Sequence, residues 1–341
     1  MNLKKINYRK LKKKTNLILI LIGFIFFFYL IYRVGIDNIV SNLSNFGFWF
    51  ILIFFLGGIW ILCQAKAWNI IQNQFFGRAS IFIFFRLRII GDALNTVLPS
   101  ANIGGDAARA YLIRNNIPLN EGIAGVFVDK TIEFIGGMLF TATGLLVSFL
   151  FSYIPESLIL PGLICLGITF LGITTLIILQ LNGFYKILLK ITSLIPSIQR
   201  FLKDQETKFR NLENNLKMLY TKATWKMVLA LAFHYLARIL GVVEVFIILK
   251  VLGIQTNFIE ALFISAMVTI INTIFFLMPG QWGVTEGAFV FVLKSLGYSA
   301  GIGLSLGIIR RIRKLFYVGL GLLFFSFRKG IKLSNRSQNA D

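Results

Sequence analysis

The sequence has few of the residues that build disulfide frameworks and metal sites. Its 341 residues include two cysteines and one histidine. Cys63 and Cys165 both lie within apolar runs, and His234 has no second histidine with which to share a metal ion. A disulfide scaffold and a zinc site are therefore excluded, and we expect neither a metal nor a cofactor.

Charged residues are also scarce. They make up 14% of the chain, against 57% hydrophobic residues, and the mean hydropathy is +0.78. A chain this apolar needs lipid around most of its side chains. A spanning helix takes roughly 20 apolar residues, and the sequence contains about seven or eight such stretches. We therefore expect an integral protein of the inner, or cytoplasmic, membrane.

Acidic residues are the scarcest charged class, with 14 Asp and Glu against 35 Lys and Arg. In a soluble protein the formal net charge of +21 would indicate a nucleic-acid partner. Here the basic residues gather at the N-terminus, at 186–226 and near the C-terminus, where they flank apolar runs. Such runs mark the cytoplasmic side of a membrane protein, so we expect no nucleic acid and two cytoplasmic termini.

The hydropathy pattern predicts the spans. Clear ones are expected at 17–32, 46–63, 123–152, 158–181, 227–249, 257–278 and 303–327. The run 17–32 lacks a small-residue cleavage pattern after it, so we expect an uncleaved span rather than a signal peptide. Segments 79–113 and 278–300 are apolar but interrupted. We expect the first to enter the membrane and return, and the second to form either an eighth crossing or a broken half-helix.

The fold class follows from these spans. The sequence predicts an all-α, polytopic transmembrane bundle of about eight crossings, with re-entrant or broken helices. Residues 1–341 would form one integral membrane domain, with halves at about 15–181 and 225–328. A basic segment at 184–222 joins them. Its apolar residues have helical spacing, which favours amphipathic helices on the cytoplasmic leaflet, although a solvated linker fits the composition as well.

The two interrupted segments share an order of residues. In the first, an Asn-Thr pair at Asn95 precedes Pro99, and Asp106 follows the proline. In the second, an Asn-Thr pair at 272–273 precedes Pro279, and Glu286 follows at the same spacing. Interrupted apolar segments in opposite halves are typical of transporter sites made from broken helices. The glycines of these segments could instead serve close helix packing.

Charged residues inside apolar spans cost a few kcal/mol unless they are paired or hydrated. Those with helical spacing are Arg88 and Asp92, Asp106 and Arg109, Asp129, Lys130 and Glu133, and His234 and Arg238. Such groups of mixed sign suit a zwitterionic or anionic lipid headgroup, and interhelical salt bridges explain each pair equally well. We expect Arg109 to hold a lipid phosphate and Asp106 to hold its guanidinium when the site is empty. His234 is expected to be a hydrogen-bonded packing residue.

Signatures of common enzymes are absent: the chain has no HExxH, no GxSxG and no P-loop. The pattern favours a transporter-like protein over an enzyme.

Several short motifs are present: Asn95 and Pro99, the run 103–106, Arg109 with 111–112, 128–130 with Glu133, and Pro279, Gly283 and 286–287. In this order they resemble the lysylphosphatidylglycerol synthase transmembrane (flippase-like) family over about residues 10–328. Lys130 stands where that family often has arginine, and Thr285 where a basic residue often precedes the Glu-Gly pair, so the headgroup stays open. The candidate headgroup residues are drawn from those that carry the resemblance, with Arg238 added: Asn95, Pro99, Gly104, Gly105, Asp106, Arg109, Asp129, Lys130, Glu133, Arg238, Pro279, Gly283 and Glu286.

The resemblance implies a lipid-handling function, with flippase-like translocation or binding of a phospholipid or lipid-linked headgroup. The full-length synthases also carry a soluble aminoacyl-transferase domain. This chain ends soon after its last predicted span, so we do not expect lysyl transfer from it. An alternative is a membrane subunit or enzyme of lipid modification, of the phosphatidylglycerol lysyltransferase type or for lipid-linked glycosyl transfer, that acts with a partner transferase. A structural scaffold is a third reading.

The distribution of Lys and Arg predicts the orientation of the loops. Cysteines introduced at positions 37, 155 and 254 should react with an impermeant thiol reagent added to intact cells. Cysteines at positions 5, 205 and 335 should react only after the membrane is permeabilised. Labelling of position 205 from outside would reverse the predicted orientation.

Overall fold

The computed structural model describes residues 46–75, 79–98, 104–151, 156–181, 224–276 and 278–327, with scattered residues of 25–45 and 206–214. Every element in these ranges is a helix. The architecture agrees with the prediction of an all-α polytopic bundle of about eight crossings with re-entrant helices. The predicted span 17–32, Pro99 and most of the basic segment 184–222 lie outside the described residues.

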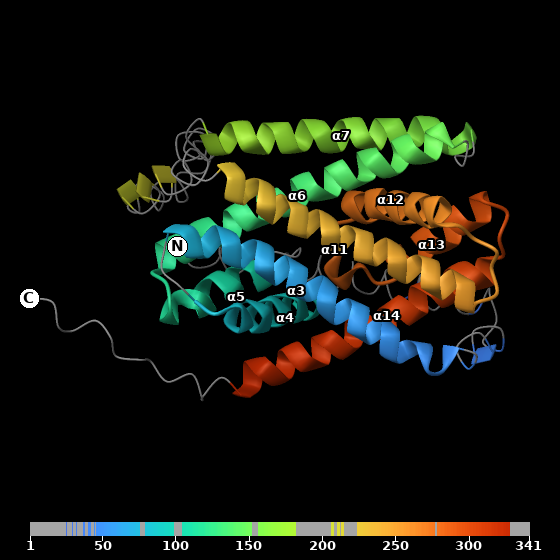
Figure 1. Ribbon diagram of the computed structural model, residues 1–341, viewed down its shortest axis with the longest axis horizontal. Coiled ribbons are helices and arrows are strands. Elements are labelled where there is room, and N and C mark those ends of the chain that lie inside the picture. Colours follow the sequence, from blue (N-terminus) through green and yellow to red (C-terminus); the bar gives the residue numbers. More distant parts are fainter. Residues whose placement is uncertain are drawn as a thin grey trace, which may run out of the picture.

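Five long helices run the length of the bundle (Figure 1): α3 (Trp49–Phe75), α6 (Leu119–Leu150), α7 (Glu156–Leu181), α11 (Thr224–Val251) and α14 (Ala300–Ser326). At 1.5 Å per residue each measures roughly 40 Å or more, which exceeds a hydrocarbon layer of about 30 Å. Three of them, α3, α6 and α11, are also apolar enough to cross a membrane by composition.

Helix α3 extends well past the predicted end of its span at residue 63. The polar residues in this extension face the protein interior rather than lipid. Gln72, for example, is fully buried, accepts a hydrogen bond from the Trp68 indole and donates one to the carbonyl of Glu121. Because its polar side chains find protein partners, the helix continues where hydropathy alone predicts a stop.

Two pairs of short helices fill the space between the long ones. The first pair is α4 (Ile81–Val97) and α5 (Gly104–Leu112), which is followed by a 3-10 turn, η1 (Ile113–Asn115). The second is α12 (Phe258–Ile274) and α13 (Val284–Ser295), with the 3-10 turn η3 (Pro279–Gln281) between them. At 17 residues or fewer, none of these helices exceeds about 25 Å, so each is shorter than a hydrocarbon layer of about 30 Å.

The two pairs enter from opposite ends of the bundle. In Figure 1, α4 and α5 occupy the left-hand part and α12 and α13 the right-hand part. Their tips meet, since η3 packs against α4 and a Cβ on Gly280 would lie 3.1 Å from the carbonyl oxygen of Thr96. Segment 79–113 therefore enters and returns as predicted. Segment 278–300 takes the second of its two predicted forms, a broken half-helix.

The two halves of the chain interleave. Helix α11 of the second half packs against α3 and α6 of the first, and α14 packs against α4. The apolar core has one cluster around Phe140, Phe263 and Phe289 and another around Trp68 and Phe84. Charged side chains of α4, α5 and α6 meet beside the second cluster.

The first re-entrant pair closes through a contact that only glycine permits. The N–H of Gly105 donates to Asn95 Oδ1 at 2.6 Å, and a Cβ on Gly105 would meet the carbonyl oxygen of Gly91 at 1.9 Å. Asn95, which the sequence assigns to a headgroup site, therefore also holds the α4–α5 hairpin together.

Gly105→Ala should destabilise the protein by about 3 kcal/mol or more, because the new methyl group collides with backbone rather than with a movable side chain. Gly167→Ala is the matched control, since nothing lies within 4 Å of a Cβ at Gly167. Thermal unfolding in detergent measures both variants. Equal midpoints for the two would contradict the close approach of α4 and α5.

Candidate functional site

Eight titratable residues from four helices meet where the first re-entrant pair, α4 and α5, packs against α6 and α11. We call this group the first ion cluster; its members are Arg88 and Asp92 of α4, Asp106 and Arg109 of α5, Asp129, Lys130 and Glu133 of α6, and His234 of α11. The chain positions span 88 to 234, so only the tertiary fold brings them together.

Asp129 is the centre of the first ion cluster. It is fully buried, and its Oδ2 lies 3.3 Å from both Arg88 Nη1 and Arg109 Nη1. Its Oδ1 lies 3.0 Å from His234 Nε2. One carboxylate thus links α4, α5 and α11 to α6. The buried His234 thus has a hydrogen-bonding partner, as expected of a hydrogen-bonded packing residue, and that partner is the central carboxylate.

Arg109 lies behind the surface of the cluster. Its side chain is 1% exposed, its guanidinium donates to Asp106 as well as Asp129, and the group packs over the Trp68 ring with Cζ 5.0 Å from the ring centroid. The prediction that Asp106 holds this guanidinium matches the geometry. The salt bridge to Asp129, which the sequence left as an alternative to phosphate binding, is also present.

Four members of the cluster form its accessible rim. Lys130 is 32% exposed and Asp92 37%, while Asp106 and Glu133 are 15% exposed. Lys130 Nζ lies 3.3 Å from Glu133 and 3.8 Å from Asp106. An incoming headgroup would therefore meet three carboxylates and one ammonium group before it reached the two buried guanidinium groups.

A second ion cluster fixes the other re-entrant tip. Arg311 of α14 donates to both carboxylate oxygens of the fully buried Glu286 and to the carbonyl oxygens of Gly280 and Gln281, each at 3.0 Å. Lys314 adds a hydrogen bond of 3.2 Å to the Gly280 carbonyl. These two cations donate hydrogen bonds to carbonyl groups that the broken helix leaves without backbone partners. Backbone groups at membrane depth need such partners.

The local backbone explains why glycine stands in this tip. Gly280 has φ +63 and Gly283 has φ +74, in the left-handed region that favours glycine. Gly283 is the N-cap of α13, and Pro279 begins η3. These two candidate headgroup residues thus shape the turn that presents Glu286 to Arg311.

The structure divides the candidate residues into groups. Those of α5 and α6 gather in the first ion cluster, with Asn95, Gly104 and Gly105 forming the hairpin beside it. Glu286 belongs to the second ion cluster, and Pro279 and Gly283 form the turn beside it. Arg238 stands apart from both, and Pro99 is not among the described residues. Whether any of them contacts a headgroup stays a prediction.

Sequence reasoning missed the basic residues of α14. Arg310, Arg311, Arg313 and Lys314 lie in the middle of the predicted span 303–327. Arg310 and Arg313 both pair with the buried Glu244 of α11, at 3.1 and 2.9 Å. The signal was available, because four cations at the centre of an apolar run are costly without partners.

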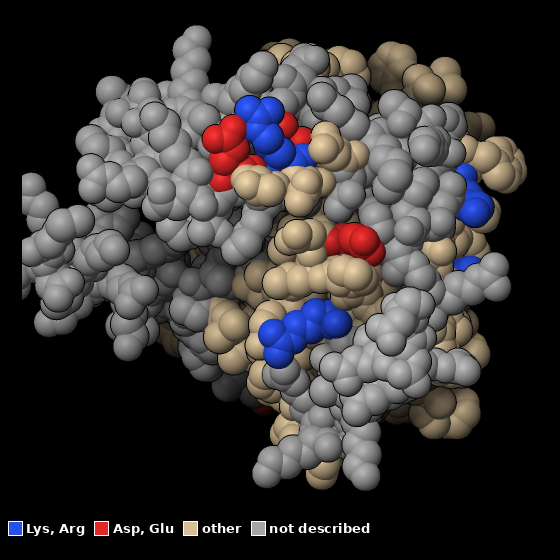
Figure 2. Space-filling view, turned by 90° about the vertical axis from the view of Figure 1, so that its left-hand side faces the viewer, with Lys and Arg blue, Asp and Glu red and all other residues tan. Residues whose placement is uncertain are grey.

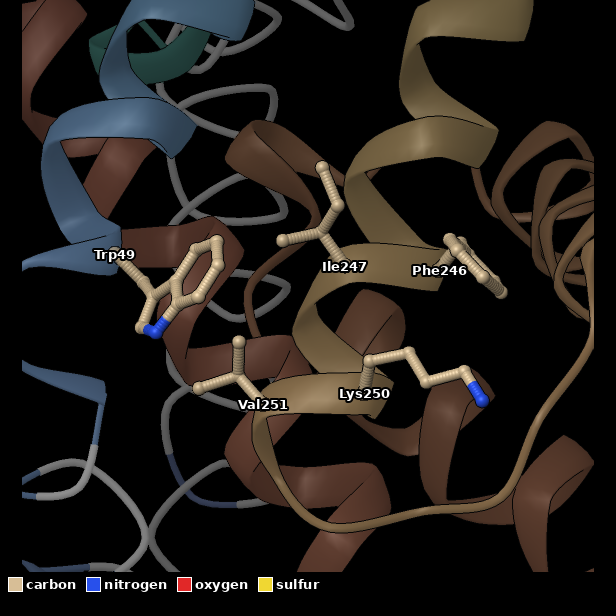
Figure 3. Close-up of a pocket in the computed structure, with 5 residues that line it drawn as sticks. All are labelled: Trp49, Phe246, Ile247, Lys250 and Val251. Carbon is tan, nitrogen blue, oxygen red and sulfur yellow. The ribbon is translucent and has the colours of Figure 1, made fainter.

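Two hollows lie outside the ion clusters. The larger, about 320 Å³, lies where α3 begins and α11 ends and is lined by Trp49, Phe246, Ile247, Lys250 and Val251 (Figure 3). It contains no member of either ion cluster. At the opposite end of the bundle, acidic and basic side chains form one mixed group and single charges lie apart from it (Figure 2). The smaller hollow, about 60 Å³, lies between α6, α11 and α12 and is lined by Arg238.

Asp129→Asn should lower the free energy of unfolding by about 3–5 kcal/mol, because it leaves two buried guanidinium groups short of a counter-charge. The control is Glu206→Gln, which breaks the exposed pair between Glu206 and Arg210 and should change stability by less than about 1 kcal/mol. Chemical denaturation in detergent compares them. A wild-type stability for Asp129→Asn would show that the cluster does not hold the helices together.

Comparison of the sequence with known proteins identifies a family. The family described as "Lysylphosphatidylglycerol synthase TM region" matches residues 16–321. A UPF0104 membrane protein of Methanocaldococcus jannaschii is 21% identical over 313 residues, which cover 89% of this chain and 91% of the relative. A UPF0104 membrane protein of Pyrococcus horikoshii is 23% identical over 338 residues, covering 92% and 97% respectively. No solved structure matches the chain. Because the family match covers most of its length, the chain belongs to the lysylphosphatidylglycerol synthase transmembrane-region family.

Proposed function

We propose that this membrane protein binds the headgroup of a phospholipid or lipid-linked molecule at the first ion cluster and moves it between the leaflets. The observation that carries the proposal is the accessible rim in front of buried guanidinium groups. A cluster that served packing alone would have no need to expose Lys130 and three carboxylates at the side of a membrane-spanning helix.

The charge balance of the cluster favours a zwitterionic headgroup. Four carboxylates (Asp92, Asp106, Asp129 and Glu133) accompany two guanidinium groups and one ammonium group. A headgroup with a phosphate and an amine adds one charge of each sign, so it can enter without leaving a new unpaired charge. A bare phosphate would add to the surplus of negative groups.

The phosphate enters by exchange. Asp106 covers the Arg109 guanidinium in the empty site and is itself partly exposed, so it can turn outward and leave its place to a phosphate oxygen. Arg109 then offers two parallel donors to the phosphate, a geometry that lysine does not provide. The released Asp106, with Glu133 beside it, accepts the headgroup amine.

The paired hairpins support movement rather than binding alone. Re-entrant helices enter from opposite ends and meet at their tips, an arrangement that transporters use to expose one site to the two sides in turn. Each tip is held by ion pairs and hydrogen bonds rather than by a continuous helix. Such contacts can be exchanged without unfolding a span.

The purified protein should be reconstituted into vesicles that contain fluorescent phosphatidylethanolamine. Dithionite added outside quenches only the outer leaflet, so a protein that moves this lipid should increase the fraction of fluorescence that is quenched. Arg109→Lys should slow this movement about tenfold although the charge is kept, since one of two charge-assisted hydrogen bonds is lost. Arg109→Ala should abolish it.

Lipid retained per folded molecule, measured by native mass spectrometry, separates binding from folding. Arg86→Ala is the control, because Arg86 bonds the Phe324 carbonyl and contacts no carboxylate of the cluster. Unchanged lipid retention in Arg109→Ala would defeat the exchange step. Retention without movement in the wild type would favour presentation of the lipid to a partner transferase.

A further inference from the structure

Arg238 is a cation in the middle of a membrane-spanning helix without an ion-pair partner. It stands near the midpoint of α11, and within the described part of the chain it makes neither a salt bridge nor a hydrogen bond. Its guanidinium lies against the backbone of Gly137 in α6, where an added Cβ would be 2.9 Å from Nη2. Glu133 interacts with the Arg238 charge electrostatically, but the two side chains are too far apart to form an ion pair.

This isolation sets Arg238 apart from the other arginines of the spans. Arg88 and Arg109 share Asp129, Arg310 and Arg313 share Glu244, and Arg311 holds Glu286. A cation at the centre of a spanning helix costs a few kcal/mol unless it is paired or hydrated. Within the described residues Arg238 therefore lacks the compensation that its neighbours have, which favours a ligand as the source of the missing counter-charge.

The small cavity beside Arg238 has the size and chemistry for an anion. Its volume is about 60 Å³, and it is lined by Arg238 with the hydroxyl-bearing Thr141, Thr269 and Thr273 and the apolar Phe134, Met138 and Ile270. Since a water needs roughly 10–15 Å³ of such volume, about four waters fit, which is comparable to the four oxygens of a phosphate. Phe134, which lines the cavity, is 41% exposed, so one wall of the cavity reaches the surface of the bundle.

One face of α6 connects this cavity to the rim of the first ion cluster. Lys130, Phe134, Gly137 and Thr141 follow one another at intervals of three or four residues, so they lie along a single stripe. The stripe begins at the exposed ammonium group of Lys130 and ends at the cavity. A headgroup that leaves the rim would meet Arg238 next, while its acyl chains stay in lipid beside Phe134.

We propose that the Arg238 cavity is a mid-membrane station for the phosphate of the same lipid. The station rests on the proposed function but names a separate group of residues, at a different depth from Arg109. Occupation by a phosphate supplies the counter-charge that Arg238 lacks. The cavity accepts the phosphate alone, and the remainder of the headgroup projects toward Glu133 or the membrane opening.

The proposal makes opposite predictions for stability and for binding. Arg238→Met keeps the length of the side chain and removes an unpaired charge, so the lipid-free protein should unfold at a higher temperature than wild type. The same variant should lose the lipid at this site. A structural arginine would behave in the opposite way, with lower stability on substitution.

A site-specific photocrosslink reports occupation. Phe134, replaced by p-benzoylphenylalanine, places the photoreactive group at the mouth of the cavity. In vesicles of equal phosphatidylethanolamine and phosphatidylglycerol, illumination should attach phospholipid to the protein, as mass spectrometry detects. In the Arg238→Met background the yield should fall about tenfold or more, since charge-assisted hydrogen bonds are lost.

Arg310→Gln is the matched control, because it removes a guanidinium from the middle of the neighbouring α14 while Glu244 keeps Arg313. Its crosslink yield should equal that of wild type. If the Arg238→Met protein folds poorly, Gly137→Ala displaces the guanidinium without removing it and should also lower the yield.

Three results would overturn the station. The first is an undiminished crosslink in Arg238→Met, and the second is a lower unfolding temperature of the lipid-free Arg238→Met protein. The third is stabilisation of the wild type by inorganic phosphate without any lipid crosslink, which would identify a site for free phosphate. Loss of the crosslink with intact lipid movement would show that the station is occupied but dispensable, which also overturns its role in transit. If vesicles with the wild-type protein do not move lipid, the proposed function is wrong. That result does not test the station, because the crosslink is measured in a separate experiment.

Discussion

The need to neutralise charge within a membrane-spanning bundle determines how this protein is assembled. Asp129 has no contact with solvent, and three helices other than its own bring a nitrogen to its carboxylate. Neither Arg88 nor Arg109 could occupy its position at low cost without that carboxylate. Asp129 is therefore the acid at which α4, α5 and α11 all meet α6, while Glu133 and Asp106 add further ion pairs between α6 and the first hairpin.

The second half of the molecule solves a related problem in a different way. Here the groups without partners are carbonyls of a broken helix, and Arg311 satisfies two of them while it pairs with Glu286. The planar guanidinium suits this task because its donors point in several directions at once. The first tip instead uses a side-chain amide, that of Asn95, to accept from the backbone of Gly105. Two similar hairpins thus hold their tips with unlike chemistry.

The contrast between paired and unpaired arginines connects this assembly to function. Most arginines of the spans have carboxylate or carbonyl partners, and those contacts maintain the bundle. Among the residues that the structure describes, Arg238 has neither kind of partner, and it lines a cavity. Lys130, with a third of its side chain exposed, stands at the other end of the same α6 stripe. In the proposals above Arg109 serves both the bundle and the headgroup, whereas Arg238 would serve lipid handling alone, so substitutions at Arg238 can separate the two roles.

The sequence by itself determined the class of the protein and the location of its irregular segments. Long apolar runs identify spans because backbone in lipid must form helices, and proline and glycine mark the breaks. The sequence also identified two local sets, Asp106 with Arg109 and Asp129 with Lys130 and Glu133, since spacing along a helix and costly charges in apolar runs are visible in one dimension.

Only the tertiary structure decided which charges are partners. Arg88 and Arg109 share an acid that lies in another helix, and His234 joins them from the other half of the chain. The fold also assigned segment 278–300 to a half-helix and extended α3 through buried polar residues. Contacts of this kind depend on how helices pack against one another, and a linear pattern of hydropathy and charge contains no information about which faces meet. For the same reason Arg238 looks like its neighbours in sequence, and its isolation is a property of the packed bundle.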